Sequence, residues 1–284
     1  MKRSPARRSG SPDKARPRLA FGLAGLALGA AAVNGALACG APAGIVHIAA
    51  VDERLDLALD DGRVVRLAGL DASIYRDPKT REAAQAMLDA RLVGQDAELR
   101  ALAGGPDRWG RIPGDLSLRK GAGERADSAA EALLAAGLAR VRPEFETRFC
   151  SPARLALEDA ARRQGVGVWA DRDRAIVPSS DLTALRRLDG HFILIEGMVR
   201  RVGFGRSRIY LDLAPRGAPT IVVPRKLEPA LARAGLAVSG LNGRDVRARG
   251  VIDGRFGLRL EVSDPAMIEL ALRPETAGEA EARQ

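Results

Sequence analysis

The stretch DGRVVRLAGLDA, residues 61–72, decides the fold of the first half of the chain. Asp61-Gly62 accepts the positive φ angles that a tight hairpin turn requires. Apolar residues alternate with polar ones at 55–59, before the turn, and form a strand-like run at 64–67, after it. A period of two is typical of a strand with one buried face. The stretch therefore predicts an antiparallel hairpin, which a strand-like segment at 45–50 extends into a meander.

Helical periodicity follows the predicted hairpin. Asp77-Pro78 opens a helix that ends at Gly94, because proline fits the first turn and glycine the end. Further strands are predicted at 97–101 and 116–118, and further helices at 128–139 and 152–164. This order indicates the α+β class. For residues 45–170 we predict a small five-stranded OB-like β-barrel with three helices.

The second half of the chain has a different pattern. Residues 171–188 combine charged residues with Pro178-Ser179-Ser180 and predict a linker. Six short strand-like segments and one helix follow between residues 191 and 262. They predict a second, mostly-β OB-like barrel over residues 189–272. The tail at 273–284 is expected to be disordered.

The N-terminal 38 residues predict an export leader. Seven basic residues and one acid give this segment a charge of +6, out of +9 for the whole chain. The uncharged apolar run at 19–38 ends in Ala36-Leu37-Ala38, the small-x-small pattern of a signal peptidase site. Cleavage would leave a periplasmic or envelope-associated protein. The run is also just long enough to span a bilayer, so an uncleaved N-terminal anchor is the alternative.

Two interpretations of Cys39 stay open. It directly follows the predicted cleavage site, as the cysteine of a lipoprotein does. However, Ala36-Leu37-Ala38 is a poor lipidation signal, because such a signal has a larger aliphatic residue at its first position, here Ala36. Alternatively, Cys39 pairs with Cys150, the other cysteine of the chain, in an oxidising compartment. Such a disulfide would close a loop of 111 residues. In the chain-entropy model it would stabilise the fold by about 4–5 kcal/mol.

Five motifs, in this order, resemble the thermonuclease (staphylococcal-nuclease-like) family. They are DGRVVRLAGLDA at 61–72, DRWGR at 107–111, LLAAGLARV at 133–141, CSPARLALEDAAR at 150–162 and GVW at 167–169. The resemblance covers about 120 residues, and it implies a nuclease-like barrel. Residues 242–250 and 262–265 resemble the OB-like extension that follows this domain in some bacterial exported proteins.

The resemblance implies calcium-assisted phosphodiester hydrolysis. In that family two Asp carboxylates hold Ca²⁺, a Glu activates water and two arginines clamp the phosphate. Carried over by resemblance, Arg66 and Arg111 are the two arginines and Asp71 is one calcium ligand. The positions of the catalytic Glu and of the other calcium ligand hold Ile74 and Leu55. A one-residue bulge would bring Asp56 into the place of that missing ligand.

These departures predict a degenerate active site in which Ca²⁺ binds weakly or not at all. The leading hypothesis is an exported, catalytically impaired nuclease homologue that binds nucleic acid, another polyanion or an envelope partner. One alternative is a weakly active calcium-dependent endonuclease. Another is a structural or scaffolding envelope protein. A zinc site is not expected, because His47 and His191 have no second ligand at a suitable spacing.

The predicted second barrel carries a cluster of arginines. Arg200, Arg201, Arg206 and Arg208 surround the segment Gly203-Phe204-Gly205. Such a cluster suits a basic groove with one stacking aromatic ring. Because aromatic residues make up only 4% of the chain, the preferred interpretation is a charged, solvated hairpin.

Overall fold

The computed structural model describes residues 39–118, 128–171, 175–214, 219–255 and 257–271. The predicted leader at 1–38 and the predicted tail at 273–284 lie outside these residues, so both stay predictions. Among the helices of the described part, none has the length and apolar character needed to cross a membrane.

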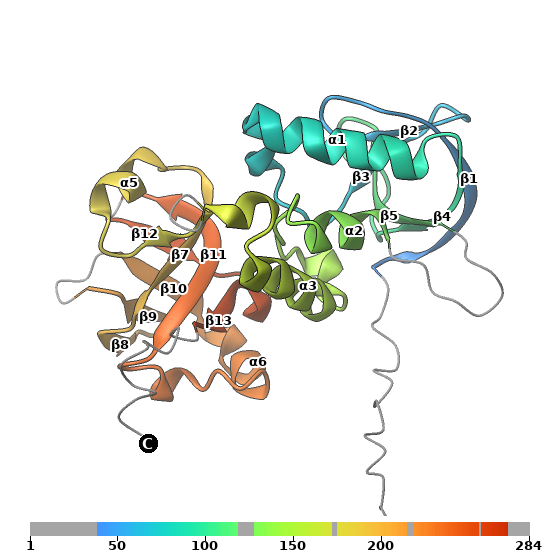
Figure 1. Ribbon diagram of the computed structural model, residues 1–284. Helices are drawn as coiled ribbons and strands as arrows, with labels where there is room; N and C mark the ends of the chain where they lie inside the picture. The colour runs from blue at the N-terminus through green and yellow to red at the C-terminus, as the bar shows by residue number, and fades with distance from the viewer. Residues whose placement is uncertain (1–38, 119–127, 172–174, 215–218, 256, 272–284) are drawn as a thin grey trace, which may run out of the picture. The chain divides into compact units, whose positions relative to one another are not determined.

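The first half of the chain forms a closed five-stranded barrel (Figure 1). Its strands lie in the order β1-β2-β3-β5-β4, and β4 closes the barrel by pairing with β1. All pairings are antiparallel except that of β3 with β5. The strands are β1 (Ala41–Val51), β2 (Leu57–Leu59), β3 (Val64–Leu67), β4 (Asp96–Ala101) and β5 (Ile112–Leu118). The predicted hairpin is β2–β3, with Gly62 at a φ of +83° in its turn.

Three helices pack on this barrel: α1 (Pro78–Leu92), α2 (Ala129–Ala135) and α3 (Ser151–Gln164). Helix α1 begins where the Asp77 side chain accepts a hydrogen bond from the Thr80 N–H. Helix α2 begins at a capping box formed by Ser128 and Glu131. It ends four residues before the predicted end at 139. The reason is Gly137, whose φ of +66° breaks the helix and whose Cα lies against the Val166 carbonyl.

The second half forms a mostly-β sheet in the order β6-β7-β11-β12-β10-β9-β8, with β13 paired to β11. The strands are β6 (Val177–Pro178), β7 (Phe192–Met198), β8 (Arg201–Phe204), β9 (Arg208–Asp212), β10 (Thr220–Pro224), β11 (Asp245–Asp253), β12 (Arg259–Glu261) and β13 (Ile268–Leu270). The helices are α5 (Leu182–Arg187) and α6 (Glu228–Arg233). The predicted α+β class with two barrel-like parts is confirmed.

The stretch predicted as a linker, 171–188, carries structure of its own. It contains β6 and α5, and β6 pairs in parallel with β7. Ile176, Val177 and Leu185 are buried in the core of the second sheet. Charged and turn-forming residues surround these apolar segments, which are too short to show a strand or helix period in the sequence. The stretch is therefore part of the second half's core.

Helix α3 and strand β11 share a buried ion pair. Glu158 on α3 and Arg249 on β11 are 0% and 1% exposed. Arg249 donates to both Glu158 carboxylate oxygens, at 2.8 and 3.0 Å, and to Glu269 at 3.2 Å. The Val141 N–H also donates to Glu158. Removing one partner of such a pair is strongly destabilising, because it leaves an uncompensated buried charge.

We expect Arg249→Met to lower the free energy of unfolding by about 3 kcal/mol, because it leaves the buried Glu158 carboxylate with Arg162, at 3.5 Å, as its remaining arginine partner among the described residues. Adding Glu158→Gln should recover part of this loss, since the amide oxygen still accepts from Val141. Urea denaturation measures both changes. Arg255→Met is the matched control, because Arg255 pairs with Asp253 at the surface. A loss no larger than that of the control would contradict the role of the buried pair.

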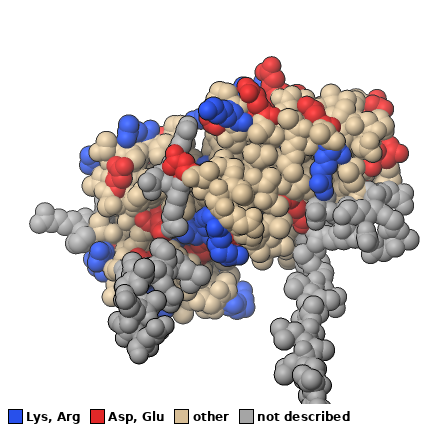
Figure 2. All heavy atoms as spheres, in the orientation of Figure 1, with Lys and Arg blue, Asp and Glu red and all other residues tan. Residues whose placement is uncertain are grey.

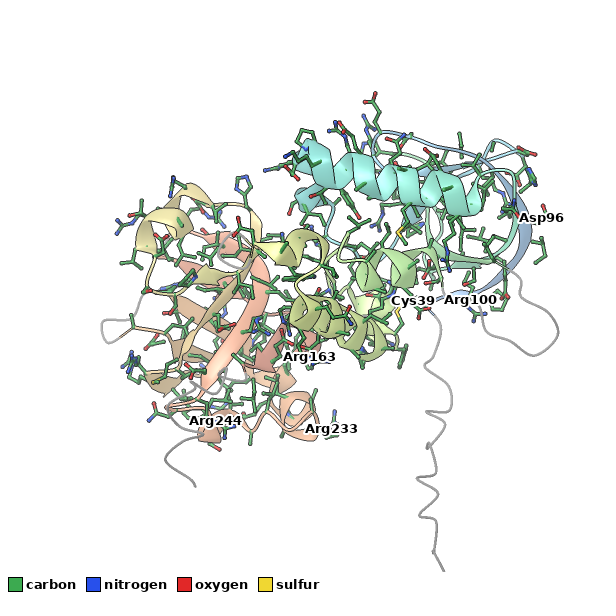
Figure 3. All side chains as sticks on the ribbon, viewed as in Figure 1. Cys39, Asp96, Arg100, Arg163, Arg233 and Arg244 are labelled. Carbon is green, nitrogen blue, oxygen red and sulfur yellow. A yellow bond between two sulfur atoms is a disulfide. The ribbon has the colours of Figure 1, made fainter. Side chains whose placement is uncertain are left out.

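Cys39 and Cys150 form a disulfide, with their Cα atoms 5.3 Å apart (Figure 3). The bond ties the start of β1 to the N-cap of α3 over a sequence separation of 111 residues. Both cysteines are buried with Ala68 and Leu102. The Cys39 sulfur is therefore engaged in this bond and is not available for lipidation.

We expect the Cys39→Ala, Cys150→Ala double variant to lose about 4–5 kcal/mol of unfolding free energy, because its unfolded chain is no longer restricted by a long closed loop. Urea denaturation with and without a reducing agent measures the effect. The reductant should destabilise the wild-type protein and leave the double variant unchanged. A wild-type protein that is insensitive to reductant, and as stable as the variant, would contradict this expectation.

Candidate functional site

A cavity of about 380 Å³ opens beside the β2–β3 hairpin. Both arginines that the sequence assigns to a phosphate clamp, Arg66 and Arg111, line it. Three further arginines contribute, so that five guanidinium groups face two carboxylates. The charged lining residues are Glu53, Arg54, Asp56, Arg66, Arg76, Arg81 and Arg111. Such an excess of guanidinium groups in one cavity favours an anion.

Arg111 precedes β5 and is held between two carboxylates. It donates to Asp56 Oδ2 at 2.9 Å and to Asp107 Oδ2 at 3.0 Å. Burial raises the pKa of the Asp56 carboxyl, and the hydrogen bond from Arg111 opposes that rise. Asp56, the predicted substitute for the missing calcium ligand, is thus a partner of the clamp arginine.

Arg66 lies on β3, and its ion pair is longer than those of Arg111. Its Nη2 is 3.7 Å from Oε2 of Glu144, and both side chains are half-buried. Glu144 stands just before the short 3-10 helix η2 (Phe145–Thr147). The sequence gives no signal for this pairing, because Glu144 lies outside the motifs and reaches Arg66 only in the folded chain.

Asp71, the predicted calcium ligand, is fully buried and fully engaged. It accepts from the Ser73 N–H at 3.0 Å, which caps the 3-10 helix η1 (Ala72–Arg76), and from two nitrogens of Arg140 at 3.1 and 2.6 Å. Asp71 is not among the residues that line the cavity. Arg140 lies within a motif that resembles the family, but only the fold shows that it pairs with Asp71.

Leu55 and Ile74, the two positions that depart from the family pattern, lie in different surroundings. Leu55 lines the cavity and is, among the described residues, the non-glycine residue with a positive φ, at +63°. An L-residue with a branched apolar side chain is strained in that conformation. Ile74 lies in η1 and lines a neighbouring hollow with Leu138 and Val168. Neither side chain offers an oxygen to a metal ion or to water.

A calcium ion does not fit these residues. Ca²⁺ takes six to eight oxygen ligands. Here the Asp71 carboxylate is neutralised by Arg140, the Asp56 carboxylate by Arg111, and Leu55 has no donor. Within the described ranges, no group of three or more His, Cys, Asp or Glu is placed to hold a metal ion. No hydrolytic step through calcium follows from this arrangement.

We expect calcium titration of the folded protein to give no saturable heat with a Kd below about 1 mM, the weak end of the range for protein calcium sites. Isothermal titration calorimetry measures this directly, with magnesium as the comparison ion. Saturable calcium binding that Asp71→Asn abolishes would show that the Asp71–Arg140 pair opens to admit the ion, and would contradict the expectation.

Three aromatic side chains are unusually exposed: Trp109 at 61%, Phe145 at 71% and Phe149 at 60%. Each has a guanidinium over its ring. Arg108 is 3.9 Å from the centre of the Trp109 ring, and Arg148 is 4.0 and 4.3 Å from those of Phe145 and Phe149. Trp109 is two residues from Arg111, and Phe145 directly follows Glu144. The residues beside both clamp arginines thus offer exposed rings.

The basic residues of the chain do not form one large patch on the face drawn in Figure 2. There, Lys and Arg side chains are interspersed with Asp and Glu. The excess of guanidinium groups in the 380 Å³ cavity is therefore a local feature of that site.

No protein-family model and no curated protein sequence matches this chain. Among solved structures, it is similar to the extended Tudor domain of Drosophila melanogaster Tudor-SN, with 16% identity and a TM-score of 0.32. The match covers 38% of this chain and 47% of that one. The likeness concerns the fold of part of the chain.

Proposed function

We propose that this chain is a thermonuclease-like protein that binds nucleic acid through its phosphodiester groups and does not hydrolyse it with calcium. The observation that carries the proposal is the single cavity shared by Arg66 and Arg111. These are the two positions that the family resemblance assigns to the phosphate. Planar guanidinium groups suit a phosphate, because each donates two parallel hydrogen bonds to its oxygens.

The carboxylates now beside the two arginines are acceptors that a phosphate can replace. Glu144 meets Arg66 at 3.7 Å and is half-buried, so this contact is weak and open to exchange. Asp56 is nearly buried and holds Arg111 from below the cavity. Arg66 is therefore the group that a ligand engages first, whereas Arg111, which Asp56 and Asp107 both bind, engages a phosphate only where a carboxylate gives way.

Hydrolysis lacks its usual groups. A general base must accept a proton, and Ile74 has no acceptor. Asp71 is bound by Arg140 and is not among the residues that line the cavity. The exposed rings of Trp109 and Phe145 support a nucleotide ligand over a bare anion, since bases stack on aromatic faces. The disulfide and the predicted leader support an exported protein, in the periplasm or envelope.

We expect the Arg66→Ala, Arg111→Ala double variant to bind a fluorescent single-stranded oligonucleotide about 100-fold or more weakly than the wild type, because each lost charge-assisted hydrogen bond removes roughly 1.5–3 kcal/mol and two are lost. Fluorescence anisotropy at fixed low salt measures the affinity. Arg233→Ala is the control, because Arg233 is exposed on α6 and does not line the 380 Å³ cavity (Figure 3).

Three outcomes would overturn the proposal. Cleavage that calcium stimulates and the double variant abolishes would show a surviving nuclease. An equal loss of affinity in Arg233→Ala would show non-specific charge attraction. Absence of binding by the wild-type chain would favour a structural role in the envelope.

A further inference from the structure

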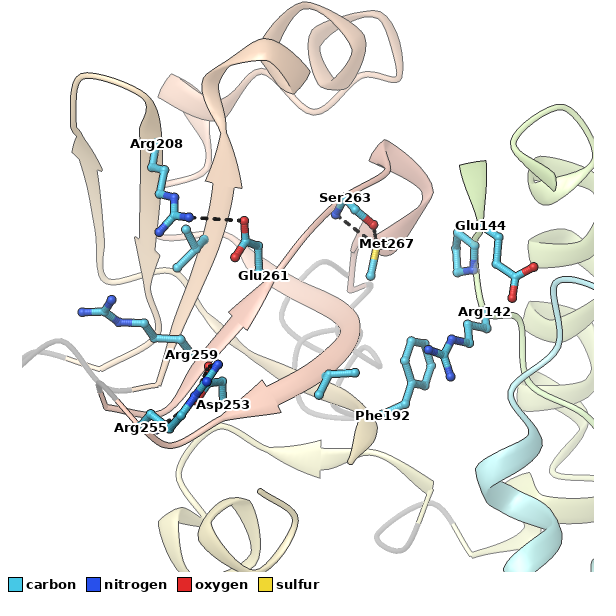
Figure 4. Close-up of a pocket in the computed structure, with 13 residues that line it drawn as sticks. Arg142, Glu144, Phe192, Arg208, Asp253, Arg255, Arg259, Glu261, Ser263 and Met267 are labelled. Carbon is cyan, nitrogen blue, oxygen red and sulfur yellow. Dashed lines mark hydrogen bonds and ion pairs between the residues drawn. The ribbon is translucent and has the colours of Figure 1, made fainter. Parts of the chain in front are cut away.

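A second cavity, of about 640 Å³, lies on the outer face of the second sheet (Figure 4). Its walls include the segment of Arg142, Pro143 and Glu144, and the turn that carries Ser263 and Met267. Its floor is the sheet itself, crossed by strands β9, β10, β12, β11 and β7. We call it the sheet groove.

Strand register arranges the floor in rows. Val222 on β10 lies beside Glu261 on β12, and Val251 on β11 lies beside Phe192 on β7. Asp253 and Arg259 form the next row, two residues along. Residues two apart on a strand share a face. In the first row Glu261 lies between Val222 and Val251, and Val251 is exposed whereas Val222 and Phe192 are buried.

Two of the groove's arginines are already paired and two are not. Arg255 pairs with Asp253 at 2.8 Å, and Arg208 faces Glu261 at 3.7 Å. For Arg142 and Arg259, no ion pair with a carboxylate occurs in the part of the chain that the structure describes. Both are exposed. Their unneutralised charges are suited to phosphate groups.

The sheet groove meets the Arg66–Arg111 cavity at Glu144. This residue lines the groove, while its carboxylate lies 3.7 Å from Arg66, which lines the cavity. Arg142, two residues before Glu144 in the sequence, also lines the groove.

We propose that the sheet groove holds the continuation of a single-stranded nucleic acid whose first phosphates lie between Arg66 and Arg111. This inference rests on the proposed function and extends its footprint. Arg142 and Arg259 contact backbone phosphates, and a base lies on Val251, the exposed apolar residue of the floor. Bases reach an apolar floor only when they are unpaired, so the ligand is a single strand. Arg142, whose guanidinium is 5.1 Å from the centre of the Phe192 ring, supplies a flat cationic surface beside that floor.

The test compares two ligand lengths. A labelled thymidine dinucleotide with a 5′-phosphate is short enough to occupy the cavity alone, whereas a twelve-nucleotide oligothymidine also reaches the groove. The Arg142→Ala, Arg259→Ala double variant should bind the long ligand about tenfold or more weakly and the short ligand unchanged. Losing two phosphate contacts should also reduce the salt slope of log K for the long ligand by about 1.4, since each contact contributes roughly 0.7 for single strands. Arg233→Ala, which removes one exposed arginine charge outside the groove, is the control. Circular dichroism checks that each variant keeps the fold.

The outcomes separate this inference from the proposed function. If the groove variant keeps full affinity and an unchanged salt slope for the long ligand, the groove inference is overturned while dinucleotide binding still supports the cavity. If it weakens both ligands equally, the groove is not a separate subsite. If a duplex of the same length binds as tightly and is as sensitive to the variant, the single-strand assignment is wrong. If the wild type binds neither ligand, the proposed function fails and the groove inference fails with it.

Discussion

The buried pair of Glu158 and Arg249 is the interaction on which the rest of the structure depends. It joins α3, which packs on the first barrel, to β11, the strand that pairs with three others in the second sheet. Glu158 also accepts from the Val141 N–H. That backbone group belongs to the segment that carries Arg142 and Glu144, so the same carboxylate that joins the halves helps to fix a wall of the sheet groove.

Backbone contacts complete this fixation. The Arg142 N–H donates to the Gly69 carbonyl, and the Asp71 N–H donates to the Arg140 carbonyl. The chain after α2 is therefore held against the end of the stretch that decides the hairpin. Side chains on both segments then meet: Arg140 reaches Asp71, and Glu144 reaches Arg66. Of these four residues, Arg66 lines the cavity.

The departures from the nuclease pattern are consistent with one another. Position 74, where the resemblance would place the catalytic Glu, holds apolar Ile74, and position 55, where it would place the second calcium ligand, holds Leu55. The remaining carboxylates are neutralised inside the protein, Asp71 by Arg140 and Asp56 by Arg111. The cavity lining still has five arginines against Glu53 and Asp56, and this excess of positive charge is suited to hold an anion.

Local sequence determined much of the fold. The Asp61-Gly62 turn, the strands on either side of it and helix α1 follow from short-range periodicity and capping. Short motifs singled out Arg66 and Arg111, and the structure places both on one cavity. The early end of α2 at Gly137 and the structured stretch at 171–188 departed from the predictions, because a close backbone contact and short apolar segments leave little periodic signal.

Only the tertiary structure decided which charges meet. Glu144 and Arg66, Arg140 and Asp71, and Glu158 and Arg249 are each far apart in the sequence. In the sequence each of these residues is equally consistent with a solvated surface group. Burial makes the difference, because a charge that leaves water must find a partner, and the partner is set by which segments the folded backbone brings together.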